Sequence, residues 1–123
     1  MSSENNVSNL LKNTPPLTFE DLKDFKSKYE RAFARLLLLK GLLVWKEPRI
    51  KGGSKPDFLV VNPKSSTRQP RLVEITQSNR KKALINKKKQ ITNMRKSGLP
   101  WMLLTRENLL KVAAANPVYR RGL

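Results

Sequence analysis

Apolar residues recur every three or four positions in the first third of the chain, from Phe19 to Leu36. This spacing is typical of an amphipathic helix. Thr18 precedes the pattern and Asp21 follows three residues later, which is a variant of the capping box. Gly41 follows the last apolar positions and favours a helix end. The pattern predicts one continuous helix over 18–40.

Four shorter apolar runs predict strands. Two of them, 57–61 and 71–76, are joined by a polar, proline-bounded segment and should pair as an antiparallel hairpin. The last run is apolar throughout, so we expect it to form a buried strand. Trp45 in the first run and Trp101 in the last are both expected to pack in the core. The four runs are 42–50, 57–61, 71–76 and 99–105.

Residues 79–97 predict a second long helix, capped by Ser78 or Asn79 and ended by Gly98. Its apolar stripe is thin and consists of Leu84, Ile91 and Met94. The helix carries eight basic residues and no acid, so we expect most of it, including Gln90, to face solvent.

A last helix should run from the Thr105 cap to Asn116 and Pro117. The order of elements is then α-β-β-β-α-β-α, which predicts an α/β fold with a central mixed sheet flanked by helices. We expect a polar N-terminal arm over 1–17, one domain over 18–115 and a basic tail over 116–123.

The amino-acid composition limits the kinds of catalytic and metal sites that the chain can form. The 123 residues include no cysteine and no histidine, which excludes disulfides, thiolate nucleophiles, imidazole bases and Cys/His zinc sites. No apolar run reaches the roughly 18 residues that span a bilayer, and the N-terminus lacks the pattern of a secretory signal. We therefore expect no membrane association and an intracellular location, either cytoplasmic or in a virion.

The net charge of +17 is unevenly distributed. Residues 31–123 hold 22 of the 26 basic residues but only four of the nine acids. Such a field attracts polyphosphates through counterion release. The sequence therefore predicts a nucleic-acid partner, although a basic protein without any catalytic site would show the same excess.

Two of the four acids lie in apolar, strand-like runs. Asp57 begins one strand of the predicted hairpin and Glu74 lies near the end of the other, so both carboxylates can meet at one edge of the sheet. Two carboxylates at such a short distance repel each other unless a cation lies between them. Magnesium or manganese would suit these oxygens, with the carbonyl of Ile75 as a third ligand. The alternative is that Asp57 caps a turn and Glu74 pairs with a surface arginine.

The segments Pro56-Asp57 and Glu74-Ile75-Thr76, in this order of elements, resemble the PD-(D/E)XK nuclease superfamily. The segment 28–45 is similar to the start of archaeal Holliday junction resolvases. The resemblance covers about residues 26–105. It implies a restriction-endonuclease-like core, metal-dependent cleavage of DNA or RNA, and often a dimer. It also implies that Glu30 is the helix acid of the site and that Asp57, Glu74 and Ile75 hold the metal.

Thr76 is a departure from the family, because the residue two positions after the glutamate is usually a lysine. Threonine can orient a water molecule but cannot stabilise charge on a phosphate. Three accounts remain open. Another lysine reaches the site, Gln77 positions water, or catalysis is lost and the fold remains. The lysines considered are Lys55, Lys81 and Lys82.

The basic helix over 80–96 follows the candidate metal site, where a nucleic-acid backbone would lie. Its side chains and the preceding loop are expected to bind phosphates without sequence specificity. We expect an endonuclease acting on DNA that is branched or comes from a phage or mobile element. The alternative is an inactive, nucleic-acid-binding part of a large assembly, such as a phage head-completion or neck protein or a ribosomal component. The expected phosphate contacts are Lys51, Lys55, Arg80, Lys81, Lys82, Lys87, Lys88, Lys89, Arg95 and Lys96.

Overall fold

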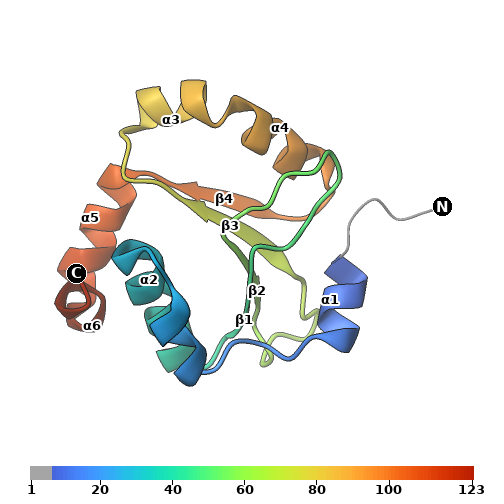
Figure 1. The fold of residues 1–123 in the computed structure, drawn as a ribbon, viewed down its shortest axis with the longest axis horizontal. Coiled ribbons are helices and arrows are strands. Elements are labelled where there is room, and N and C mark those ends of the chain that lie inside the picture. Colours follow the sequence, from blue (N-terminus) through green and yellow to red (C-terminus); the bar gives the residue numbers. More distant parts are fainter. Residues whose placement is uncertain (1–6) are drawn as a thin grey trace.

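A four-stranded mixed sheet forms the centre of the protein in the computed structural model, which describes residues 7–123 (Figure 1). Its strands are β1 (Leu43–Lys46), β2 (Phe58–Val61), β3 (Arg71–Ile75) and β4 (Trp101–Leu104). They lie in this order, with β1–β2 and β2–β3 antiparallel and β3–β4 parallel. The predicted hairpin and the α/β class with a central mixed sheet are confirmed.

Helices cover both faces of the sheet (Figure 1). On one face, α2, α5 and α6 pack with η1 over the apolar side chains of Phe58 and Val73. On the other, α1 and α4 pack over Leu59 and Leu72. The helices are α1 (Val7–Asn13), the 3-10 helix η1 (Glu20–Asp24), α2 (Lys28–Leu39), α3 (Arg80–Asn86), α4 (Lys88–Lys96), α5 (Arg106–Ala115) and α6 (Pro117–Arg121).

The continuous helix predicted over 18–40 is wrong. The Thr18 backbone N–H and hydroxyl bond the Asp21 carboxylate, as the capping pattern suggests, but this turn continues only as η1. The chain then becomes extended at Phe25, and α2 starts afresh at Lys28, where the Ser27 hydroxyl accepts a hydrogen bond from the Glu30 N–H. Glu30 therefore lies in the first turn of α2.

The second long helix is also interrupted. It consists of α3 and α4, separated at Lys87, whose φ of −111° and ψ of 23° are not helical. Ile91 and Met94 are buried as predicted, but Leu84 is 46% exposed, because the break turns α3 relative to α4. The Asn79 side chain caps α3, as the sequence predicted.

The burial predicted for the fourth strand is wrong as well. Trp101 is 36% and Met102 46% exposed. β4 is an edge strand, paired only with β3, so its first residues lack a neighbouring strand on one side. Trp45 is buried as expected, and its indole N–H donates to the Thr14 carbonyl.

Both ends of the chain contain helices that the sequence reasoning did not predict. Val7 of α1 joins the core on the α4 side of the sheet. Tyr119 of α6 is fully buried and packs edge-on against Phe33 of α2. The folded part therefore extends beyond 18–115 in both directions. Residues 1–6, the start of the predicted arm, lie outside the described residues.

No helix within residues 7–123 is both long enough and apolar enough to cross a membrane.

Candidate active site

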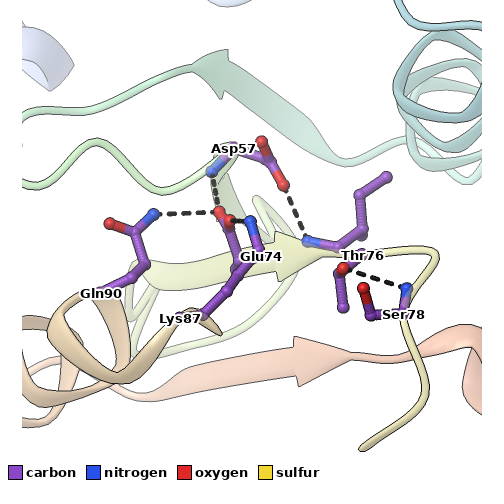
Figure 2. Close-up of polar contacts among 7 residues, drawn as sticks. Asp57, Glu74, Thr76, Ser78, Lys87 and Gln90 are labelled. Carbon is purple, nitrogen blue, oxygen red and sulfur yellow. Dashed lines mark hydrogen bonds and ion pairs between the residues drawn. The ribbon is translucent and has the colours of Figure 1, made fainter. Parts of the chain in front are cut away.

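Asp57 and Glu74 meet where β2 begins and β3 ends. Phe58 pairs with Val73 in the antiparallel register, so the preceding Asp57 lies opposite Glu74. The Asp57 backbone N–H donates to Glu74 Oε1 over 2.9 Å (Figure 2). The Ile75 N–H donates to Asp57 Oδ2 over 2.8 Å. The sheet register therefore brings the two predicted carboxylates together.

Glu74 is buried and Asp57 is partly buried, and the two carboxyl groups interact directly. Glu74 is only 3% exposed. Burial first and the charge of Glu74 second raise the pKa of Asp57 from 3.8 to about 8, although the hydrogen bond from the Ile75 N–H acts in the opposite direction. The raised pKa favours the protonated form of Asp57 when no cation is bound.

Two side chains from the basic helical segment complete the contacts of Glu74. The Lys87 ammonium pairs with Glu74 Oε2, and the Gln90 amide donates to Oε1 over 3.1 Å (Figure 2). The expectation that Gln90 faces solvent is wrong, and so is the pairing of Glu74 with a surface arginine. Lys87 was expected only to bind phosphate, yet its ammonium pairs with Glu74.

A signal for Lys87 was present in the sequence. The apolar stripe Leu84, Ile91 and Met94 has a helical gap at position 87, and a lysine occupies that gap. Gln90 follows three residues later, which places it on the same side of a helix. The three lysines considered instead, at positions 55, 81 and 82, are all exposed, and none bonds either carboxylate within the described part of the chain.

Glu30 lies near the pair but does not bond it. It is half-buried, and burial raises its pKa, while the Lys46 charge opposes the shift and Glu47 and Glu74 add to it. Glu30 lines a small cavity of about 60 Å³ together with Ile75 and Thr76. Within residues 7–123, no three or more acidic, histidine or cysteine side chains are grouped to hold a metal ion.

Thr76 is directed away from the carboxylates. Its hydroxyl accepts a hydrogen bond from the Ser78 N–H over 3.2 Å, and Figure 2 shows the side chain next to Ser78. Over residues 7–123 it makes no hydrogen bond with Asp57 or Glu74. The predicted catalytic role of Thr76 therefore has no contact to support it.

The donor set of the pair suits a hard divalent cation. Both side chains carry carboxylate oxygens, which magnesium and manganese prefer, although a cation would have to share the Glu74 oxygens with Asp57 N–H, Gln90 and Lys87. Asp57 Oδ1 accepts no hydrogen bond from any described residue, and a cation there would take the place of the proton. Asp57 and Glu74 are the residues that would hold the ion, and the Ile75 carbonyl stays a predicted third ligand.

The other expected phosphate contacts lie on two neighbouring segments. One is the exposed side of α3 and α4, and the other is the loop before Asp57. The Asn93 amide on α4 donates to the Ser54 hydroxyl over 2.6 Å, which joins this loop to the helix. Gly52 packs so closely on Asn93 that an added Cβ would lie 2.5 Å from its Oδ1. We name these exposed positions the basic surface: Lys51, Lys55, Arg80, Lys81, Lys82, Lys88, Lys89, Arg95 and Lys96.

No family model, no curated protein and no solved structure matches this chain.

Proposed function

We propose that this protein is a metal-dependent endonuclease of the PD-(D/E)XK type that hydrolyses phosphodiester bonds in nucleic acid, with DNA as its substrate. One observation carries the proposal. A partly buried aspartate and a buried glutamate lie together at the ends of adjacent strands, and a lysine from a strongly basic helical segment contacts the glutamate. The Asp57 and Glu74 carboxylates could hold a cation, and Lys87 offers a positive charge to the phosphate. The basic helical segment beside them offers a surface for the nucleic-acid backbone.

The order of elements supports a restriction-endonuclease-like arrangement. A helix, a three-stranded antiparallel meander, a helical segment and a strand parallel to β3 follow one another along the chain. Asp57 and Glu74 occupy the acid positions of the resemblance, and Glu30 lies on the preceding helix. Lys87 replaces the family lysine from a different element.

The residues of the chain have separate tasks in the proposed reaction. A water molecule gives one proton to solvent as its oxygen forms a bond to phosphorus. The bond from phosphorus to the leaving sugar oxygen breaks, and that oxygen takes one proton from solvent. A bound divalent ion would polarise the phosphate and lower the pKa of water. Lys87 stabilises negative charge that grows on the phosphate oxygens. Gln90 holds the Glu74 carboxylate in place through its amide.

The basic surface is proposed to hold the nucleic-acid backbone. Its residues flank Lys87 on α3 and α4, so a strand bound there would run past the carboxylate pair. Contacts with phosphates fix the register of a strand and carry no sequence information. Binding should therefore weaken steeply as salt rises.

A second function has one observation in its favour. Lys87 already neutralises Glu74, and the raised pKa of Asp57 keeps that group neutral, so the pair is satisfied without a metal. Such a pair, with its charge balanced by the protein itself, fits an inactive, nucleic-acid-binding component of a large assembly.

Cleavage of a supercoiled plasmid and of a four-way DNA junction, with magnesium or manganese, decides between the two. We expect Glu74→Gln to abolish cleavage and Lys87→Met to lower it at least about 100-fold, the usual effect of removing one group that stabilises the charged transition state. Lys64→Met removes an equal charge from an exposed turn and should leave the rate within about twofold. The absence of cleavage by the wild type, with salt-sensitive binding retained, would refute the endonuclease and favour the assembly component.

A further inference from the structure

A second, larger cavity adjoins the candidate active site. Its volume is about 330 Å³, within the size range of small-ligand sites. It shares Tyr29, Gln77 and Leu109 with the small cavity that contains Glu30 and Thr76. The larger cavity therefore begins directly beside the residues that follow Glu74 in the chain.

The walls of this cavity combine apolar, aromatic and polar groups. Leu109, Leu110 and Ala113 of α5 provide an apolar wall, and Tyr29 of α2 provides an aromatic ring. Leu110 is 62% exposed. Such a side chain at the rim offers contact area to a flat, apolar ligand.

The polar groups in the cavity lining are of types that can bind a nucleotide. Gln77 is exposed and lines the cavity with an amide, which can both donate to and accept from the edge of a base. Arg106 is exposed at the same cavity and pairs with no carboxylate among the described residues. The Lys28 ammonium lies 5.5 Å from the centre of the Tyr29 ring. The cavity therefore has one basic group in its lining, Arg106, and a second, Lys28, near the Tyr29 ring, and either charge could attract the phosphates of a bound nucleotide.

We propose that this cavity binds one unpaired nucleobase of the nucleic-acid substrate, next to the bond that is cut. Stacking on tyrosine accepts any base, since every base has a π-face. A paired base in a duplex cannot enter, because its edge is occupied and its faces are stacked. The proposal rests on the proposed function for the position of the cut. It specifies the substrate class as strands with unpaired nucleotides, such as branch points and single strands.

Two variants of the cavity and one control variant outside it test the role of the cavity. Ala113→Trp fills the cavity, whereas Ala114→Trp places the same ring on the neighbouring exposed position of α5, outside the lining. Gln77→Ala removes the amide from an exposed position and leaves the core intact. Thermal melting of all three controls for folding.

The probe is a single-stranded oligonucleotide, compared with the same oligonucleotide carrying abasic sites and with a blunt duplex. Abasic sites remove the bases but keep every phosphate. With calcium in place of magnesium to prevent cleavage, the wild type should bind the intact strand about tenfold more tightly than the abasic strand, the usual effect of losing one stacked base. Ala113→Trp should remove this difference and Gln77→Ala should reduce it. Ala114→Trp should keep it, and affinity for the blunt duplex should be alike in all.

Equal binding of intact and abasic strands by the wild type, or an unchanged difference in Ala113→Trp, would refute the base-binding cavity. Either result leaves the plasmid assay untouched, because that assay reports on Glu74 and Lys87. Base-dependent binding without any cleavage would refute the endonuclease alone and retain the cavity as a binding site.

Discussion

The Asp57 carboxyl should give the metal-free protein a stability that falls as the pH rises. Its pKa is about 8 in the folded protein and near the ordinary value of 3.8 in the unfolded chain. Between these two values the folded state binds the proton and the unfolded state does not. The free energy of unfolding therefore decreases from about pH 4 to about pH 8 and is flat with respect to this group above pH 8.

The size of the effect follows from the shift. A shift of one pH unit corresponds to about 1.4 kcal/mol, so about four units give an upper limit of roughly 6 kcal/mol. Asp57 is only partly buried, so screening by solvent reduces this limit, and we expect an effect on the order of 2 kcal/mol. Asp57→Asn removes the titrating group, while its amide oxygen still accepts the hydrogen bond from the Ile75 N–H.

Thermal melting in EDTA at pH 4.5 and pH 8.5 tests this reasoning. Relative to the wild type, Asp57→Asn should gain about 7 °C more in Tm at pH 8.5 than at pH 4.5, since 1 kcal/mol corresponds to about 3–4 °C for a domain of this size. Asp24→Asn, which removes an exposed carboxylate, should shift Tm about equally at the two pH values. An equal shift for Asp57→Asn at both pH values would show that the carboxyl is ionised in the native protein, and the electrostatic account of the pair would be wrong.

Three further changes test the packing around the site. Tyr119→Phe should raise the free energy of unfolding by about 1 kcal/mol in urea denaturation, because the buried hydroxyl has no hydrogen-bond partner among the described residues; a loss of stability would indicate a partner. Gly52→Ala should lower the free energy of unfolding by at least about 1 kcal/mol more than Gly53→Ala does. Both glycines have positive φ, but an added Cβ meets Asn93 only at Gly52. Equal Tm values for the two variants would contradict the close contact. Ser27→Ala should lower stability by about 1 kcal/mol through loss of the α2 cap, and an unchanged Tm would place the start of α2 elsewhere.

The hairpin and its two carboxylates follow from local patterns. Apolar runs with a polar, proline-bounded connection specify an antiparallel pair, and the pairing brings the start of one strand beside the end of the next. Asp57 and Glu74 could therefore be placed together from the sequence. Helix boundaries could not, because the apolar spacing continues through Phe25 while the Ser27 cap restarts the helix. The exposure of Trp101 depends on the position of β4 at the edge of the sheet. No local sequence pattern indicates the order of the strands.

The lysine of the site shows why the remaining part was missed. A lysine at position 76 would be held by β3 itself, two residues from Glu74. Lys87 instead reaches Glu74 from a break between two helices, and its position depends on the packing of Ile91 and Met94 against the sheet. The sequence reasoning grouped Lys87 with the exposed bases of the helix, although it occupies the gap in the apolar stripe. In such a stripe, a charged residue at a buried spacing is a sign of a buried partner, because an unpaired charge there would be too costly to retain. The candidate site is thus shared between the β2–β3 hairpin and the docked helix, and it forms only when that docking is complete.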